Sequence, residues 1–133
     1  MRTLLSALLA LAFALTGCGP APIKLINSPV VPAATGEITT AEGDNGNLQL
    51  EIDVKFLAPP EKVAAGASVY VVWLEQVGTP PQNVGALRVG EDRRGRLHTV
   101  TAFHRFPLMI TAEANPATAV PTGPRVLSAV VDR

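Results

Sequence analysis

The sequence contains a single cysteine, Cys18, among its 133 residues. No disulfide can therefore form within one copy of the chain. Histidine is almost as scarce, with only His98 and His104. A zinc site normally needs three or four close ligands, so we predict solvent-facing histidines and no metal. Because 11 Lys and Arg balance 11 Asp and Glu, the chain lacks the basic footprint that nucleic acid requires.

Recognisable catalytic motifs are also missing. Ser68 and Ser128 fall in expected strands and Ser28 in a proline-rich segment, and none has a Gly-x-Ser-x-Gly context. Residues 42–47 carry side-chain oxygens but lack the acidic run and terminal Glu of a calcium loop. The arginines of residues 93–96 follow two acidic residues, as in an ordinary solvated turn. We therefore predict a protein that is not an enzyme.

The start of the chain carries a short apolar run. Arg2 precedes residues 3–15, which are dominated by Leu and Ala. This run is too short to cross about 30 Å of hydrocarbon, and with small residues after it the pattern is typical of a secretory signal. Its last residues are Leu15-Thr16-Gly17-Cys18. This tetrapeptide resembles the lipobox of bacterial lipoproteins.

The resemblance to a lipobox implies a signal peptide over residues 1–17 and a lipid, palmitate among its acyl chains, on Cys18. The covalent lipid is the only non-protein group that we expect. Two or three acyl chains anchor a protein stably where one does not. The alternatives are an ordinary cysteine in a signal cleaved elsewhere, or a retained anchor. Gly19 follows the cysteine, which by resemblance to the sorting rule of enteric bacteria favours the periplasmic side of the outer membrane.

We expect the remaining chain to divide into a tether and one domain. Residues 18–36 contain the lipidated cysteine and four prolines without periodicity, and residues 37–133 form the domain. A proline-rich segment of this length could extend to roughly 50 Å. Its apolar stretch, residues 23–26, is suited to rest on the lipid surface or on the domain, although a plain spacer is the simpler interpretation.

The domain has the pattern of a β-sheet protein. Apolar and polar residues alternate without a fault over residues 48–56, which predicts a half-buried strand with Phe56 on its buried face. Asn45-Gly46 suits a tight hairpin to a preceding strand. Residues 69–74 are apolar on both faces, which predicts a central strand covered on both sides. Trp73 lies on this strand and is expected to be a core residue. The expected strands are residues 37–42, 48–56, 69–74, 84–89, 97–103, 108–114 and 126–131.

These strands are short and separated by regular turn signals, and no amphipathic helix is evident. This pattern predicts an all-β protein with a small immunoglobulin- or fibronectin-III-like sandwich of about seven strands. Residues 78–82 contain Pro80-Pro81 and are expected to be a loop, as are residues 115–124.

Several strand and loop motifs occur in a characteristic order. They are Leu57 through Pro60, Gly66, Val69-Tyr70-Val71-Val72-Trp73-Leu74, Gly85-Ala86-Leu87, Ile110-Thr111-Ala112-Glu113 and Pro121-Thr122-Gly123-Pro124. Over residues 36–131 this pattern resembles the extracytoplasmic domain of the anti-sigma-K factor family. In that family a sigma-binding domain and a transmembrane helix precede the module, whereas here a lipobox and tether do. The resemblance therefore implies the fold and an extracytoplasmic location, without sigma-factor binding.

Two functions remain open. The first is a membrane-anchored binding or scaffolding module in the cell envelope, with a protein or cell-wall partner and a link to envelope signalling. The second is a small ligand carrier or a pilot-like assembly lipoprotein. Long proline-bearing loops often carry function, and the residues predicted to contact a partner are Thr79, Gln82, Asn83, Asn115, Thr118 and Thr122.

Overall fold

The computed structural model describes residues 17–133, so the predicted signal peptide lies outside the described residues except for Gly17. No helix within residues 17–133 is long and apolar enough to cross a bilayer. In chain order the elements are β1 (Ile23–Lys24), β2 (Ile26–Asn27), β3 (Thr35–Glu42), β4 (Leu48–Lys55), α1 (Pro60–Val63), β5 (Val69–Gln76), β6 (Thr79–Leu87), β7 (Gly95–Thr101), β8 (Arg105–Glu113) and β9 (Arg125–Asp132).

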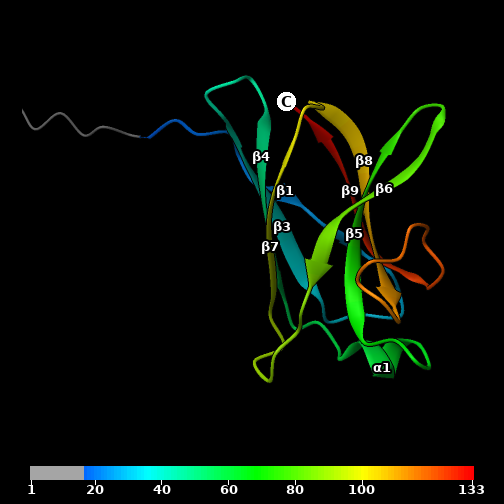
Figure 1. Ribbon diagram of the computed structural model, residues 1–133. Coiled ribbons are helices and arrows are strands. Elements are labelled where there is room, and N and C mark those ends of the chain that lie inside the picture. The colour runs from blue at the N-terminus through cyan, green and yellow to red at the C-terminus, as the bar shows by residue number, and fades with distance from the viewer. Residues whose placement is uncertain (1–16) are drawn as a thin grey trace, which may run out of the picture.

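The strands form two antiparallel sheets that face each other across one core (Figure 1). One sheet has the order β1-β3-β4-β7 and the other β2-β9-β8-β5-β6. The predicted all-β sandwich is confirmed, and each of the seven expected strands is present. The two additional strands, β1 and β2, are two residues long each.

The alternation in β4 is confirmed along the strand but fails at its end. Leu48, Leu50, Ile52 and Val54 are all 1% exposed or less and point into the core. Phe56 was predicted to join them, yet it is 65% exposed. Its φ of 55° turns the chain out of the strand, and such a left-handed residue ends the period of two. Leu57 is buried next to it instead.

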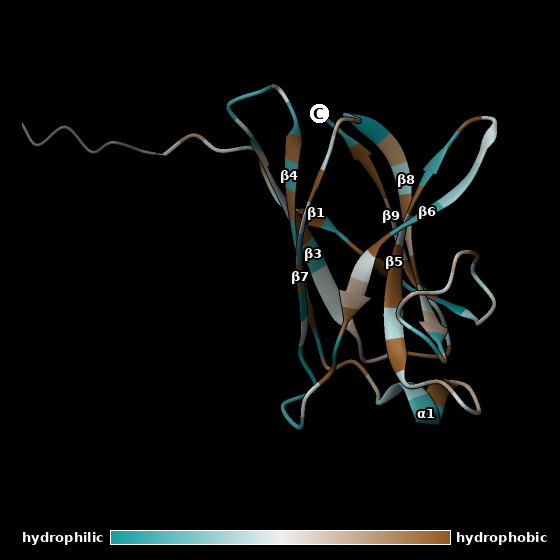
Figure 2. Cartoon of the chain, viewed as in Figure 1, coloured by the Kyte–Doolittle hydropathy of each residue, from teal (hydrophilic) through white to brown (hydrophobic). Residues whose placement is uncertain are grey.

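Strand β5 is buried on both faces, as its sequence predicts. It lies between β8 and β6 in the five-stranded sheet. One face contributes Tyr70, Val72 and Leu74 to the core between the sheets. The other face forms a second buried cluster with Trp73 at 0% exposure, and β5 is correspondingly apolar along much of its length in Figure 2.

The prediction of a loop at residues 78–82 is wrong, because Pro80 and Pro81 lie within β6. Strand β6 is at the edge of its sheet, so its outer side has no neighbour that would require a backbone N–H. The pairing with β5 is also irregular opposite the prolines, where the register shifts between Leu74 and Gln76. Edge position and irregular pairing together accommodate both prolines.

The prediction of a tether as far as residue 36 is also wrong. Strand β1 pairs with β3 at the edge of one sheet, and β2 pairs with β9 at the edge of the other. Between and after them Leu25, Val31 and Ala34 are buried. A two-residue strand is too short to show periodicity in a sequence, so the sequence of this segment does not distinguish it from a spacer. Only residues 19–22 separate Cys18 from the sandwich.

Candidate functional site

The predicted lipid attachment site lies just ahead of the folded domain. Cys18 is exposed and makes no disulfide. Gly17 lies in open space, while Leu15 and Thr16 of the predicted lipobox fall outside the described residues. Five residues of fully extended chain span at most about 18 Å. A lipid on Cys18 would therefore keep the start of β1 close to the membrane surface, much closer than the predicted tether would.

The two segments predicted to contact a partner contact each other. Asn83 of β6 donates hydrogen bonds through Nδ2 to the backbone oxygens of Pro116, at 2.9 Å, and Thr118, at 3.0 Å. Its Oδ1 accepts a bond from the backbone N–H of Gly85 at 3.0 Å. Asn83 thereby ties the edge strand to the loop over residues 114–124, which lies on the outer side of the five-stranded sheet (Figure 1).

A chain of polar contacts runs beneath this loop. Trp73 donates through Nε1 to Thr111 Oγ1 at 2.8 Å, and Thr111 donates through its hydroxyl to Glu113 Oε1 at 2.6 Å. All three side chains are at most 2% exposed. They come from neighbouring strands, β5 and β8, on the face that points away from the main core. The predicted core position of Trp73 is confirmed.

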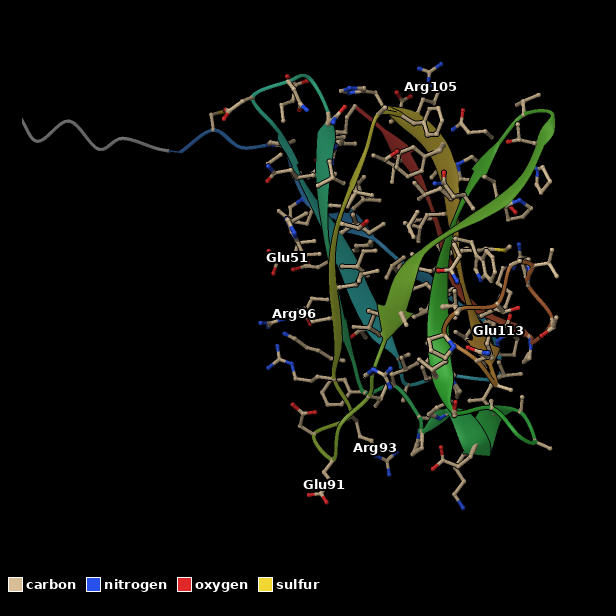
Figure 3. All side chains as sticks on the ribbon, in the orientation of Figure 1. Glu51, Glu91, Arg93, Arg96, Arg105 and Glu113 are labelled. Atoms are coloured by element: carbon tan, nitrogen blue, oxygen red, sulfur yellow. The ribbon has the colours of Figure 1, made fainter. Side chains whose placement is uncertain are left out.

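Glu113 receives further hydrogen bonds from the loop. The backbone N–H groups of Thr122 and Gly123 donate to Oε1 at 2.9 Å and 3.1 Å, and the Thr122 hydroxyl donates to Oε2. Figure 3 places Glu113 beside this loop. Burial raises the pKa of the carboxyl group, but its hydrogen bonds outweigh that effect and hold the pKa below its ordinary value. Glu113 is therefore a buried anion stabilised by donors from both sides.

The end of the loop packs against the sheet so closely that only glycine fits there. A Cβ at Gly123 would lie 1.6 Å from the backbone oxygen of Ala112. The Ala112 N–H in turn donates to the backbone oxygen of Pro124 at 3.1 Å. Residues 114–124 are thus fastened at several points, and the network holds the loop in place on the sheet.

Four of the six predicted contact residues make hydrogen bonds in or around the loop over residues 114–124. Asn83 and Thr122 bind within the network, and Thr118 supplies one of its carbonyl oxygens. Asn115 accepts a bond from the Ala117 N–H within the same loop. Sequence reasoning missed Glu113 as the centre of the network. The signal for it was an acidic residue at the end of an otherwise apolar strand, followed by Pro121-Thr122-Gly123-Pro124.

Two of the predicted contact residues, Thr79 and Gln82, lie at the start of β6 and are exposed. Thr79 donates a hydrogen bond to the backbone oxygen of Gln76 across the hairpin, at 3.3 Å.

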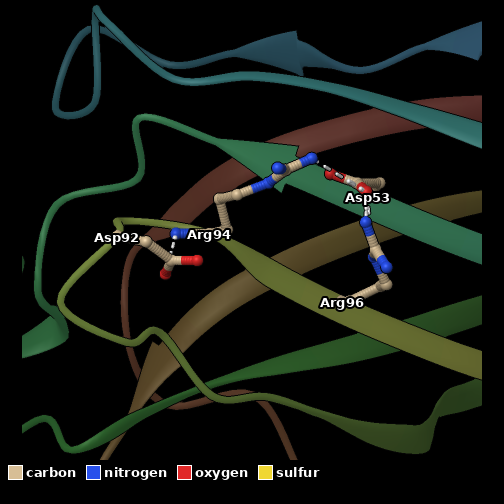
Figure 4. A network of polar contacts seen from close by, with 4 residues as sticks. All are labelled: Asp53, Asp92, Arg94 and Arg96. Atoms are coloured by element: carbon tan, nitrogen blue, oxygen red, sulfur yellow. Dashed lines mark hydrogen bonds and ion pairs between the residues drawn. The ribbon is translucent and has the colours of Figure 1, made fainter.

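The outer face of the four-stranded sheet is charged. Arg96 of β7 contacts Asp53 Oδ2 of β4 at 2.8 Å, and Arg94 reaches the same oxygen at 3.7 Å (Figure 4). Asp53 Oδ1 is buried and makes no hydrogen bond within the described residues. Arg96 and Glu51 point away from the sandwich in Figure 3. Exposed pairs of this kind contribute about 0–1 kcal/mol, so this face adds little to the free energy of unfolding.

The histidines lie apart from one another. His98 is exposed on β7, opposite Glu51 of β4. His104 is half-buried in the turn before β8, with Nε2 2.9 Å from the backbone oxygen of Gly46. Across residues 17–133, no three His, Cys, Asp or Glu side chains gather closely enough to hold a metal ion.

The described part of the chain has hollows on its surface, of which two regions are considered for binding. One of about 360 Å³ lies where the chain crosses from β1 to β2, and its charged lining residues are Lys24, Glu37, Asp53 and Lys55. Two others, of about 230 and 210 Å³, lie over β2, β8 and β9 and share Ile26, Arg125 and Ser128. Ile26 is 70% exposed there and Val130 is 66% exposed, so the second region is an exposed apolar patch at a sheet edge.

Comparison with known proteins adds no relative. No protein-family model matches the chain, and no curated protein matches it.

Proposed function

We propose that this chain is a bacterial lipoprotein of the cell envelope, anchored through Cys18, with an extracytoplasmic sandwich that acts as a binding or scaffolding module. In a Gram-negative host the domain would lie on the periplasmic side of the outer membrane. The observation that carries the proposal is the exposed, unpaired Cys18 next to a lipobox-like sequence. A thioether to diacylglycerol and an amide-linked acyl chain would give it two or more hydrocarbon anchors.

A partner surface is supported by the apolar patch around Ile26 and Val130. Contiguous exposed apolar area on a soluble domain marks interaction sites more often than scattered single residues do. The patch also lies beside β9, whose pairing with β2 extends only over Leu127 and Ser128. Backbone groups of β9 beyond this pair have no strand neighbour on that side within the described residues. An envelope protein or cell-wall partner would combine apolar contact with the backbone edge of β9 toward Val130, since on the other side of the pair the Val126 oxygen already accepts from Ser28.

Mass spectrometry of the protein from its native membrane tests the anchor. We expect a mature chain that begins at Cys18 and carries diacylglyceryl and acyl mass. The Cys18→Ser variant should carry no acyl mass. A native chain that begins at Met1, or an unmodified Cys18, would contradict the proposal.

Photo-crosslinking in intact cells tests the binding role. A photoreactive amino acid at Val130 should give a discrete adduct, whereas the same group at the exposed turn residue Glu91 should not. Equal labelling at both positions would argue against a partner at the patch.

A small-ligand carrier is the second candidate. It is favoured by the hollow of about 360 Å³, which lies near the lower limit of known ligand pockets. Its two lysines and two acidic residues suit a small zwitterionic molecule. Calorimetric titration with amino acids and short peptides would test this function. Binding that the Lys55→Ala variant abolishes would favour the carrier, and the absence of heat would exclude these ligands.

A further inference from the structure

Three turns lie at the same end of the sandwich. They are residues 43–47 between β3 and β4, residues 77–78 between β5 and β6, and residues 102–104 between β7 and β8. His104 Nε2 lies 2.9 Å from the backbone oxygen of Gly46, which joins two of the turns. At the strand ends next to the other pair, Gln76 Nε2 donates to the backbone oxygen of Arg105 at 3.3 Å. We call this surface the anchor-side end.

The chain from Cys18 enters the domain at this same end. Strand β1 runs antiparallel to β3, so residues before Ile23 head toward the turn at residues 43–47. Arg133 donates through its guanidinium to the backbone oxygen of Ala21 and to Thr40 Oγ1, and its N–H donates to the His104 oxygen. Arg133 therefore fastens the segment after Cys18 beside β3 and the turn at residues 102–104, and in Figure 1 this segment joins the domain next to the β3–β4 turn.

The anchor-side end exposes apolar side chains where turns normally carry polar ones. Val77 is 106% exposed at the tip of the β5–β6 hairpin, next to Gly78 with its φ of 81°. Two-residue hairpin turns favour Asn, Asp and Gly, and Val77 contributes no packing to the fold. Phe103 is 40% exposed in the neighbouring turn. Figure 2 shows the hydrophobic colour at the tip of the β5–β6 hairpin.

Exposed apolar residues also occur at the opposite end, where Phe56 is 65% exposed. There, however, they adjoin a charged turn, since the N–H of Leu57 donates to the Arg93 oxygen. The two ends also differ in their distance from the point where the chain from Cys18 enters the domain. An eight-residue strand spans about 27 Å, whereas the segment from Cys18 to β1 spans at most about 18 Å. An anchored domain can bring the anchor-side end to the membrane more readily than the opposite end.

From these observations we infer that Val77 and Phe103 insert into the lipid interface and fix the orientation of the domain on the membrane. This inference rests on the proposed lipid anchor. The charged residues of this end are Glu42, Asp44, Asp132, Arg105 and Arg133. Because acids are not outnumbered by bases there, the contact is an apolar insertion into neutral lipid and does not depend on anionic headgroups.

Three tryptophan variants of the full lipidated protein test the inference. Val77→Trp and Phe103→Trp place a reporter on the anchor-side end, and Phe56→Trp is the matched control on the opposite end. Each protein is reconstituted in phosphatidylcholine vesicles whose acyl chains carry bromine near the headgroup. The native Trp73 is fully buried and supplies a constant background, measured with the wild-type protein.

Interfacial apolar side chains lie about 5–10 Å into the boundary between headgroups and acyl chains, so the bromines should reduce the added emission at 77 and 103 about twofold. The control at 56 should be unaffected. Intact mass of the same samples separates the two proposals. If acyl mass is absent from Cys18, the lipid anchor and the insertion both fail. If acyl mass is present but 77 and 103 are quenched no more than 56, the insertion alone is overturned.

Discussion

Thr122 donates two hydrogen bonds to Glu113, one from its backbone N–H and one from its hydroxyl, although the residues are nine positions apart in the chain. The bonds fold residues 114–124 back onto the outer face of the five-stranded sheet. Trp73 and its neighbours on that face are buried even though this face points away from the second sheet. The Glu113 carboxylate is thus one of several contacts that hold this irregular loop on the sheet, together with Asn83 and the Ala112–Pro124 backbone bond.

Replacing this carboxylate should destabilise the protein. In the Glu113→Gln variant the buried amide loses the charge-assisted bonds and presents its NH2 group to donors. We expect the free energy of unfolding to fall by about 2 kcal/mol, as measured by urea denaturation. Glu91→Gln, in an exposed turn, is the control and should change it by less than about 0.5 kcal/mol. If Glu113→Gln lowered the free energy of unfolding no more than Glu91→Gln does, the hydrogen bonds of Glu113 would contribute no stability.

The same group predicts how stability depends on pH. The pKa of Glu113 is lowered in the folded state, so its contribution is complete above the unfolded pKa of about 4.3. It is lost as the pH falls below that value and through the lower folded pKa. The stability difference between the wild type and Glu113→Gln should therefore narrow on acidification. Urea denaturation curves of both proteins between pH 7 and pH 3 measure this difference in the free energy of unfolding. A difference that stays constant over this range would contradict the prediction.

Gly123 should tolerate no side chain. Because a Cβ there would lie 1.6 Å from the Ala112 oxygen, Gly123→Ala must displace the loop or the strand and break the bonds to Glu113. We expect a loss of about 2–4 kcal/mol and faster amide hydrogen exchange at residues 114–124. Gly19→Ala, in open space, is the matched control. Unchanged exchange in Gly123→Ala would mean that the loop is not held as described.

Tyr70 offers a spectroscopic test, because it is the only tyrosine in the chain. Its hydroxyl donates to the backbone oxygen of Ala58 at 2.6 Å. Burial, and then the negative charge of Glu61, raise the pKa of Tyr70 to about 12. Absorbance at the tyrosinate band should therefore titrate near this value in the folded protein and near about 10 in urea. A folded midpoint near that of the unfolded chain would contradict this burial.

The raised pKa of Tyr70 also has a consequence for alkaline stability. Ionisation is disfavoured in the folded state, so the contribution of the neutral hydroxyl is complete below about pH 10. It is lost as the pH rises through the folded pKa. The Tyr70→Phe variant keeps the ring but cannot ionise, so its free energy of unfolding should fall less than that of the wild type between about pH 10 and pH 12, as measured by urea denaturation. An equal fall in both proteins would contradict the prediction.

The architecture was predictable from the sequence because long strands carry long patterns. The alternation from Leu48 to Val54 and the continuous apolar run of β5 each mark their strands, and both are confirmed. The failures are local conformations that no pattern reveals. Phe56 leaves its strand through a positive φ, and Pro80 and Pro81 are accepted because β6 is an edge strand, which only the assembled sheet determines.

The polar network was less predictable because its contacts are not periodic. The sequence marks Asn83 and Thr122 as polar residues near prolines, but their hydrogen-bond partners depend on how the loop folds over the sheet. Loops usually run over the protein surface, so their polar side chains are expected to face solvent. Here one loop directs several polar groups inward, and the sequence alone does not distinguish that arrangement from a freely solvated one.

The chain crosses from one sheet to the other between β1 and β2, and this crossing has a mechanical consequence. Tension applied at Cys18 would reach β3 through Ile23 and Lys24, and then β9 through Ile26 and Asn27. The two sheets would therefore be loaded one after the other, and the buried Leu25 would leave the core after β1 has separated from β3 and before β2 separates from β9. Single-molecule pulling from this end should therefore release the N-terminal strand in a small early step before the sandwich ruptures.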